Sequence, residues 1–397
     1  MEFLLSEIFD KPISGEWGKE LEEGEQGVPV IRTTNFTNIG RLNLKDLVFR
    51  NIDIDKYSNK RLNKGDLIIE KSGGSPTQPV GRVVIFDEDN DKTYFFNNFT
   101  SVLRPKEMLN SHYALYLMKD LYNKRKVLKY QNKTTGIINL KLNDYISNTK
   151  IELPSIDIQE RIAEVLDLNQ SLIDKKKEQI EKLDLLVKSK FIEMFGDPVT
   201  NFKKWDKVAI GEVFEIKTGA TPSRKENSYW EDGTIPWVKT TELKEYVINE
   251  TEEYITEDGF NNSSVSLLPK NTILIAMYGQ GKTRGMTGKL GIEATTNQAC
   301  AAILPNNKEN MDFVWYQLRL LYDELRSLGQ GGSQPNLNTN LVKTYQLIFP
   351  PVELQNEFER FINHVDKLKF EMEKSLKELE DNFNSLMQKA FKGELFN

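Results

Sequence analysis

The chain repeats itself: segments of its first 200 residues recur in the same order about 200 residues later. The recurring segments share their order of apolar, glycine and hydroxyl residues; they are residues 27–34 with 233–241, 62–69 with 268–275, 81–83 with 288–290, 153–160 with 350–357, and 189–196 with 385–393. A long internal repeat marks a structural unit that has been duplicated. The 397 residues are therefore predicted to form two tandem copies of one unit of about 200 residues.

The first part of each copy, residues 1–150 and 199–348, is predicted to be rich in strands. Short β-branched and aromatic runs, such as RVVIF at 82–86 and NTILIAM at 271–277, alternate with Gly, Pro, Asn and Asp turns. One helical stretch precedes the end of each part, at 112–129 and 312–328. The predicted fold class is α+β, with two tandem strand-rich mixed α/β domains.

The second part of each copy, residues 151–198 and 349–397, is predicted to be a long helix. Apolar residues recur at every seventh position; they are Leu166, Ile173, Ile180, Val187 and Met194 in the first copy, and Phe358, Val365, Met372, Leu379 and Leu386 in the second. A sustained heptad indicates a coiled coil. Because the chain must return to its start, we expect the two helices to pair antiparallel. The alternative is that each helix packs only on its own domain.

Composition limits the classes of function. Hydrophobic residues make up 39% and charged residues 28% of the chain, as in an ordinary soluble protein, and no apolar run approaches membrane-spanning length. One cysteine and two histidines argue against an internal disulfide and a structural metal site. A cytoplasmic protein without a metal or a membrane partner is expected. The net charge of −6 does not indicate nucleic-acid binding, but eight bases and two acids lie between 119 and 150, and a bound polyanion responds to the local field.

Residues 276–283, AMYGQGKT, fit a permissive phosphate-loop pattern. The repeat supplies an internal control, because the equivalent residues 70–77, EKSGGSPT, have no Gly-Lys-Thr. A phosphate loop also opens a helix, whereas the Gly- and Thr-rich residues that follow favour a turn and a strand. The sequence therefore disfavours an ATPase.

The strand framework repeats while the loop tips differ, which is typical of two copies of a binding domain that recognise different targets. Residues 133–140 in the first copy and 330–337 in the second are both rich in amides and hydroxyls. Asn and Gln side chains suit adenine, Arg and Lys suit guanine, and lysines also hold phosphates. Solvated loops without a ligand are the alternative.

Three segments carry a resemblance to a known family: LPSIDIQERIAEVLDLNQSLI at 153–173, GSQPNLN at 332–338 and KAFKGELF at 389–396. Together with the duplication, they resemble the specificity subunit of Type I restriction–modification enzymes over essentially the whole chain. The first copy has TTGIINL where the second has GSQPNLN, which weakens transfer of single residues to the first copy.

The resemblance implies that each strand-rich domain is a target-recognition domain for one half of a bipartite site on double-stranded DNA. It also implies that the helical regions form a spacer that sets the gap and docks methyltransferase (modification) subunits, which restriction/translocase subunits join. The chain would catalyse nothing, and S-adenosylmethionine, ATP and Mg²⁺ would belong to the partner subunits. No Asn/Asp-Pro-Pro-Tyr/Phe methylation motif occurs in the sequence.

The residues expected to face DNA follow from their positions in the loops. For Arg32 and Lys239, a fold-stabilising role is the alternative. In the first copy the residues expected to face DNA are Arg32, Thr33, Thr34, Lys71, Ser72, Ser75, Thr77, Gln78, Arg82, Lys133, Thr134, Asn139 and Lys141. In the second they are Lys239, Thr240, Thr241, Tyr278, Gln280, Lys282, Thr283, Arg284, Gln330, Ser333, Gln334, Asn336 and Asn338.

Two other functions stay open at this point. One is a coiled-coil scaffold whose domains bind proteins, and the other is a specificity subunit that serves methylation alone. Salt dependence separates the scaffold from a DNA reader, because neutralising phosphates releases counterions.

Overall fold

The computed structural model describes residues 1–75, 77–134, 137–279, 281–329 and 335–396. Its contacts divide the chain into two compact units. Unit 1 comprises Met1–Lys177 with Lys374–Asn397, and unit 2 comprises Glu178–Glu373. Each unit contains one strand-rich domain and parts of both long helices.

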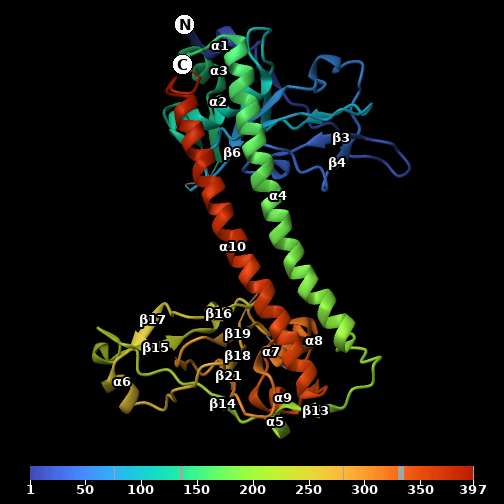
Figure 1. Ribbon diagram of the computed structural model, residues 1–397. Coiled ribbons are helices and arrows are strands. Elements are labelled where there is room, and N and C mark those ends of the chain that lie inside the picture. The colour runs from blue at the N-terminus through green and yellow to red at the C-terminus, as the bar shows by residue number, and fades with distance from the viewer. Residues whose placement is uncertain (76, 135–136, 280, 330–334, 397) are drawn as a thin grey trace. The chain divides into compact units, whose positions relative to one another are not determined.

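Three sheets and a strand pair build the strand-rich part of unit 1 (Figure 1). The four-stranded sheet has the order β2 (Ile13–Ser14), β9 (Thr100–Leu103), β5 (Leu67–Glu70), β7 (Val83–Ile85). The second sheet has the order β4 (Val48–Arg50), β3 (Val28–Ile31), β8 (Phe95–Phe96), and the third β10 (Gln131–Thr134), β11 (Ile137–Leu140), β6 (Ser72–Gly73). Strand β1 (Glu2–Leu4) pairs with β12 (Lys150–Glu152).

Unit 2 repeats this plan. Its five-stranded sheet has the order β14 (Ile216–Thr218), β21 (Cys300–Ile303), β18 (Ile273–Ala276), β19 (Thr287–Leu290), β16 (Val247–Ile248). A second sheet joins β17 (Glu253–Ile255), β15 (Ile235–Val238) and β20 (Thr295–Thr296), and β13 (Lys207–Ala209) pairs with β22 (Gln346–Ile348). Strand β18 lies between β21 and β19 as β5 lies between β9 and β7, and the β3–β8 and β15–β20 pairs are both parallel. The predicted duplication and α+β class are confirmed.

Each unit also contains shorter helices. They are α1 (Leu5–Ile8), α2 (Ser111–Asn123) and α3 (Leu142–Asn148) in unit 1, and α5 (Ile210–Val213), α6 (Glu257–Asn261), α7 (Met311–Leu320), α8 (Tyr322–Ser327) and α9 (Thr339–Thr344) in unit 2. Single 3-10 turns occur at Thr33–Asn35, Ser58–Lys60, Lys126–Tyr130, Asn227–Tyr229 and Thr240–Glu242. The prediction of one helix over 112–129 was wrong at its end. Helix α2 stops at Asn123, because Arg125 takes a left-handed conformation (φ 57°) and a 3-10 turn follows.

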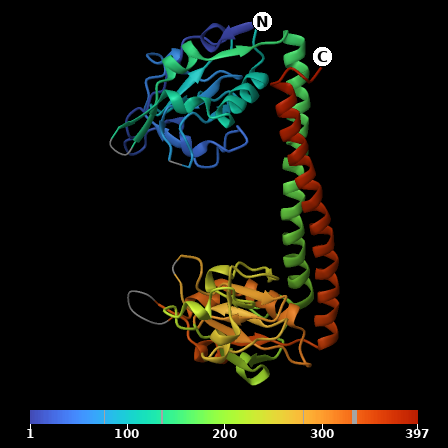
Figure 2. The ribbon, with the colours of Figure 1, turned by 90° about the vertical axis from the view of Figure 1, so that its left-hand side faces the viewer.

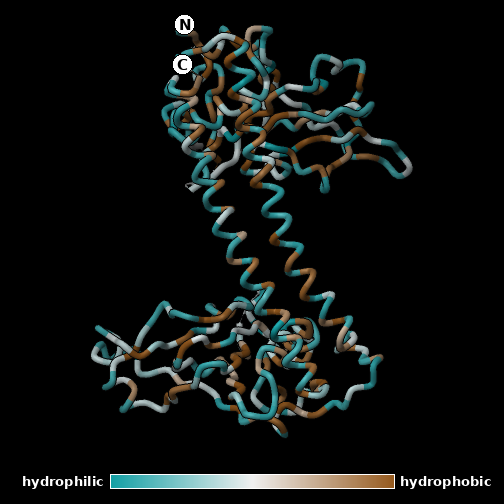
Figure 3. The backbone as a smooth tube through the Cα atoms, in the orientation of Figure 1, coloured by the Kyte–Doolittle hydropathy of each residue, from teal (hydrophilic) through white to brown (hydrophobic). Residues whose placement is uncertain are grey.

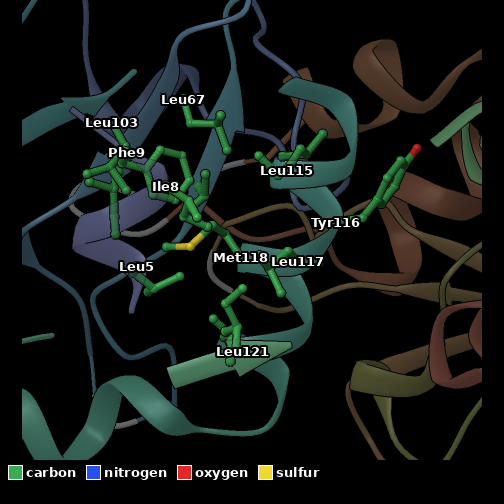
Figure 4. Packing of buried hydrophobic residues seen from close by; sticks show 14 of the residues in the cluster. Leu5, Ile8, Phe9, Leu67, Leu103, Leu115, Tyr116, Leu117, Met118 and Leu121 are labelled. Carbon is green, nitrogen blue, oxygen red and sulfur yellow. The ribbon is translucent and has the colours of Figure 1, made fainter. Parts of the chain in front are cut away.

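Helix α2 supplies the largest share of the core of unit 1. Its residues Leu115, Leu117, Met118 and Leu121 are buried together with Leu5 and other residues of α1, β5 and β9 (Figure 4). The sequence favours this packing because apolar residues recur in α2 at spacings of three and four, from Leu115 to Met118 and from Leu117 to Leu121. The core therefore fixes the sheet whose strand ends carry the predicted DNA-facing residues.

The long helices are α4 (Ile156–Phe195) and α10 (Val352–Ala390), and apolar residues recur along both (Figure 3). In unit 1 the beginning of α4 lies beside the end of α10, and Leu166 and Met387 belong to one buried cluster (Figure 2). In unit 2 the end of α4 lies beside the beginning of α10, with the rings of Phe191 and Phe358 5.3 Å apart. The helices pair antiparallel, as predicted. The alternative was wrong, because each domain packs on parts of both helices.

A buried glutamine attaches each long helix to its own domain. The side-chain oxygen of Gln159 accepts the backbone N–H of Asn110 at 2.9 Å, and its amide nitrogen donates to the carbonyl oxygens of Met108 and Pro154, both at 3.0 Å. Asn110 is the N-cap of α2. The amide of one side chain therefore joins the start of α4 to the start of α2.

Gln355 makes the same attachment in unit 2. Its oxygen accepts the N–H of Asn310, the N-cap of α7, at 3.0 Å, and its nitrogen donates to the carbonyl oxygen of Pro350 at 2.8 Å. Both glutamines are fully buried. The repeat therefore preserves this joint as well as the strands.

A second contact joins α2 to α4 in unit 1. His112 Nδ1 lies 2.6 Å from Asp167 Oδ2, and Arg41 and the hydroxyl of Tyr116 both contact Asp167 Oδ1 at 2.8 Å. The hydrogen bond to Asp167 raises the pKa of His112. Burial acts to raise the pKa of Asp167, but the bonds from His112 and Tyr116 outweigh it and the pKa is lowered.

The His112→Asn variant is expected to be less stable than the parent chain in a pH-dependent way. A histidine whose folded pKa is raised contributes stability that is fully present below its unfolded pKa, near 6.5, and is lost as pH rises through the folded value. The loss of thermal stability should therefore be larger at pH 5.5 than at pH 8.5. The measurement is the melting temperature at both pH values. The exposed His364→Asn is the control, and an equal loss at both pH values in His112→Asn would contradict the expectation.

None of the described helices is both long and apolar enough to span a membrane. Within the same described residues, no group of three or more His, Cys, Asp or Glu side chains is placed to hold a metal ion.

Candidate DNA-recognition edges

Three hydrogen bonds gather separate loops at one edge of the unit 1 domain. The backbone N–H of Asn97 donates to the carbonyl oxygen of Ile31 at 2.9 Å. The N–H of Lys71 donates to the carbonyl oxygen of Phe99 at 2.9 Å, and the N–H of Leu140 donates to the carbonyl oxygen of Lys71 at 2.8 Å. These bonds bring together the segments after β3 and β5, the β8–β9 turn and strand β11. We call this region, residues 32–34, 71–75, 77–78, 97–99 and 137–141, the first edge.

The same three bonds recur in unit 2. The N–H of Asn297 donates to Val238 at 3.2 Å, that of Met277 to Ala299 at 2.8 Å, and that of Leu337 to Met277 at 3.0 Å. They gather residues 239–241, 277–279, 281–284, 297–299 and 335–338, which we call the second edge. In both units, the loops that sequence analysis selected separately lie together.

The Thr-Thr segments begin a 3-10 turn at each edge. The N–H of Arg32 donates to Asn35 Oδ1 at 2.9 Å, and that of Lys239 to Glu242 Oε1 at 2.7 Å. Their second threonines, Thr34 and Thr241, are exposed, whereas Thr33 and Thr240 are partly covered.

The charged ends of Arg32 and Lys239 are engaged within the protein. Arg32 Nη2 donates to the carbonyl oxygen of Asp46 at 3.3 Å. Lys239 Nζ binds Glu252 at 2.8 Å and Glu253 at 2.9 Å, and the bond to Glu252 is the main reason that the pKa of Lys239 is raised. These contacts support the fold-stabilising alternative, and a DNA contact by either residue stays a prediction.

Arg82 is also held by an acid. Its Nε lies 2.9 Å from Oε2 of the buried Glu70, and its guanidinium lies over the ring of Phe36. In unit 2, Lys289 on β19 is buried and paired with Asp312. Arg82 therefore faces the interior more than the solvent, which sequence alone did not indicate.

The remaining polar side chains of the first edge are more accessible. Ser72 Oγ donates to Asn139 Oδ1 at 2.6 Å, which joins β6 to β11. Lys71 contacts Ser14 Oγ, and burial, followed by repulsion from Lys60, lowers the pKa of Lys71. The negative charge of a phosphate group beside Lys60 and Lys71 would offset the repulsion between them.

The other predicted residues of the first edge divide by exposure. Ser75 Oγ lies 3.1 Å from Thr77 Oγ1, and Thr77, Gln78 and Lys141 are exposed. Lys133 and Thr134 lie in β10.

The second edge presents an aromatic ring and a lysine. Tyr278 is 41% exposed, and Lys282 is exposed while its carbonyl oxygen accepts the hydroxyl of Tyr322 at 2.7 Å. Arg284 donates to the carbonyl oxygen of Pro335, which ties the two loops of this edge together. Thr283 is partly covered.

Among the residues after Pro335, Asn336 is partly covered, and Asn338 Oδ1 caps α9 by accepting the N–H of Leu341 at 2.9 Å. Gln280, Gln330, Ser333 and Gln334 lie outside the described residues.

The loop that resembles a phosphate loop leads into a strand. The described residues from Gly281 to Leu290 contain turns and then β19, and no helix begins among them. The arrangement that places a phosphate at a helix N-terminus is therefore missing from this part of the chain.

The turn at the centre of each edge is not among the site residues predicted from the sequence. Asn98 and Phe99 in unit 1 and Gln298 in unit 2 are exposed and lie between the predicted loops. The available signal was the recurrence of an amide pair between two apolar strands, Asn-Asn at 97–98 and Asn-Gln at 297–298.

The chain matches a family model described as Type I restriction modification DNA specificity domain, over residues 1–183 and again over 202–381. It is 25% identical to the EcoR124I/EcoR124II specificity subunit of Escherichia coli over 230 residues, which is 56% of each protein, so this alignment spans about half of that relative. It is 22% identical to the StySPI specificity subunit of Salmonella potsdam over 93% of this chain and 82% of the relative.

Two solved structures share the fold. One is the S subunit of a Type-I restriction-modification system from M. genitalium, with a TM-score of 0.57 and 18% identity over 98% of this chain and 96% of that one. The other comes from work on complex assembly and conformational transition of the type I R-M system, with a TM-score of 0.60 and 15% identity over 100% and 98% of the two chains. The two matched ranges together cover most of the sequence, and the chain therefore belongs to the Type I restriction modification DNA specificity domain family, with one copy of the domain in each half.

Proposed function

We propose that this chain is the DNA-sequence-specificity subunit of a Type I restriction–modification complex. Residues 1–150 and 199–348 are two target-recognition domains, each reading one half of a bipartite site on double-stranded DNA through its edge. The observation that carries the proposal is the repetition of one hydrogen-bonded frame in which two of three corresponding side chains differ. Lys71, Phe99 and Leu140 in the first edge correspond to Met277, Ala299 and Leu337 in the second.

The duplication places two weakly binding recognition domains on one chain, which raises the affinity for sites that contain both half-sites. When both half-sites are engaged, the second contact is intramolecular, so the affinities multiply only if the half-sites have the right separation. The helical regions, residues 151–198 and 349–397, set that separation and dock the methyltransferase subunits. The buried Gln159 and Gln355 support this role, because each holds a long helix in a fixed position on its own domain.

Catalysis belongs to the partners in this proposal. A methyltransferase subunit that binds S-adenosylmethionine flips the target adenine out of the stack, and a restriction/translocase subunit uses ATP and Mg²⁺. The chain itself supplies the DNA sequence specificity, and the complex assembles on DNA in the cytoplasm.

The test is to map adenine methylation in cells that contain the cognate methyltransferase subunit, once with this chain and once without it. A new motif of two short halves around a fixed gap is expected. Replacing residues 1–150 by the equivalent domain of a related subunit should change one half only. Copurification of the two proteins without any bipartite methylation would instead favour the protein scaffold.

The Lys282→Gln variant is expected to weaken DNA binding about equally for all sequences. Lys282 is exposed on the second edge, and loss of one phosphate contact lowers the slope of log K against log salt by about 1. The measurement is affinity at several salt concentrations. Lys270→Gln is the control, because Lys270 is exposed before β18, at the end of that strand opposite to the edge. Equal slopes for both variants would show that Lys282 contacts no phosphate.

A further inference from the structure

We infer that Phe99 is a specificity-determining residue that contacts the C5 methyl group of a thymine in the first half-site. The inference rests on the proposed function. It concerns the turn that joins β8 to β9 at the centre of the first edge, which the sequence did not single out.

The turn that carries Phe99 is held rigidly. The backbone N–H and the hydroxyl of Thr100 both donate to the carbonyl oxygen of Asn97, at 3.0 and 2.8 Å. The carbonyl oxygen of Phe99 accepts the N–H groups of Lys71 and Ser72, at 2.9 and 3.2 Å. The backbone of Phe99 is therefore fixed on both sides, although its side chain is 48% exposed.

Unit 2 shows that the turn does not need the phenyl ring. There the N–H of Cys300 donates to Asn297 at 3.2 Å, and Met277 donates to Ala299 at 2.8 Å, so Ala299 occupies the place of Phe99 in the same frame. An alanine that forms the same turn argues against a structural requirement for the ring. The 48% exposure of Phe99 is therefore not required by the fold of the turn.

A single exposed aromatic residue is ordinary on a protein surface, and the same unit has another in Phe49, which is 51% exposed on β4. The neighbours of Phe99 make the difference. Lys71 and Ser72 donate to its carbonyl, Asn98 precedes it and is exposed, and Asn139 bonds Ser72. Phe99 therefore shares the first edge with polar groups that suit phosphates and base edges, and with the exposed Ile137.

The chemistry of the major groove of DNA determines which base group the Phe99 ring contacts. Base edges in the major groove present donors and acceptors, and the thymine methyl is the apolar group among them. A phenyl ring at a reading edge therefore discriminates thymine from cytosine, and from uracil, which differs from thymine only by that methyl. The second edge has Gln298 beside Ala299, and the side-chain oxygen of Gln298 accepts the hydroxyl of Thr221.

The experiment uses the complex of the full chain with its methyltransferase subunit. After the methylated motif is mapped, affinity is measured for duplexes in which each thymine of the first half-site, on either strand, is replaced in turn by uracil. The parent chain should lose about tenfold at one position. Phe99→Ala should bind the thymine and uracil duplexes equally at that position and should methylate sites that are degenerate there, with the second half unchanged.

Two further variants make the result decisive. Phe49→Ala should behave like the parent chain, and Phe99→Leu, which keeps an apolar side chain, should retain part of the discrimination. The inference is overturned if Phe99→Ala keeps the parent motif and the parent response to every uracil, or if the first half-site contains no thymine on either strand. Absence of any bipartite motif for the parent chain would overturn the proposed function itself, so the two failures are distinguishable.

Discussion

Replacing Gln159 by alanine is expected to destabilise unit 1 by on the order of 2–4 kcal/mol. The side chain is fully buried, and its amide bonds the Asn110 N–H and the carbonyl oxygens of Met108 and Pro154. Alanine would leave these groups unpaired and open a cavity. Gln159→Glu should also destabilise, because a carboxylate oxygen would face two carbonyl oxygens in place of the amide N–H groups.

Amide hydrogen exchange localises this effect. Gln159→Ala should speed exchange in α2 of unit 1, whereas Gln355→Ala should speed exchange in α7 of unit 2, because each glutamine accepts the backbone N–H of the N-cap residue of that helix. Glu160→Ala, an exposed neighbour on α4, is the control. If Gln159→Ala lowered stability no more than Glu160→Ala, the glutamine would not be the joint between helix and domain.

Lengthening both long helices by one heptad is expected to move the half-sites apart without changing them. Duplicating residues 174–180 in α4 and 373–379 in α10 keeps the sevenfold apolar series of each helix, since Ile180 and Leu379 end the duplicated segments. Seven residues add about 10 Å of helix, which equals about three base pairs of DNA at ~3.4 Å per pair. The methylated motif should keep both halves and gain about three unspecified positions.

The control for the longer helices inserts four residues in α4 alone, after Ile180. This change shifts the apolar series of one helix against the other and should abolish specific methylation rather than alter the gap. An unchanged gap in the matched double insertion, with methylation retained, would contradict the role of the helices as the spacer.

Much of the framework could be predicted from the sequence. The sevenfold apolar series, with no Pro or Gly between Ile158 and Gly196, predicted α4 as it is observed, Ile156–Phe195. The loss of Gly-Lys-Thr in the equivalent loop and the Gly- and Thr-rich residues after Thr283 predicted a strand where a phosphate loop would need a helix, and β19 is that strand. These predictions succeeded because they depend on residues close together in the sequence.

The composition of the edges could be predicted only in part. Lys71 and Ser72 were selected from their loop, but Phe99 lies more than 20 residues away, and a hydrogen bond between strands joins it to them. Arg82 was selected for its charge, although Glu70 binds it on the neighbouring strand. Sequence reasoning cannot place such partners, because strand order decides which acid lies beside which base.

By itself, the sequence determined that this protein has two copies of an α+β unit and two long helices that pair, since duplication and heptad spacing are properties of the linear chain. The tertiary structure alone decided which loops meet. It joined Lys71 to Phe99, and Met277 to Ala299, through the order of strands in each sheet. It also decided which cations stay available to a ligand, because Arg82 and Lys239 have carboxylate partners brought close by strand pairing, while Lys282 remains exposed.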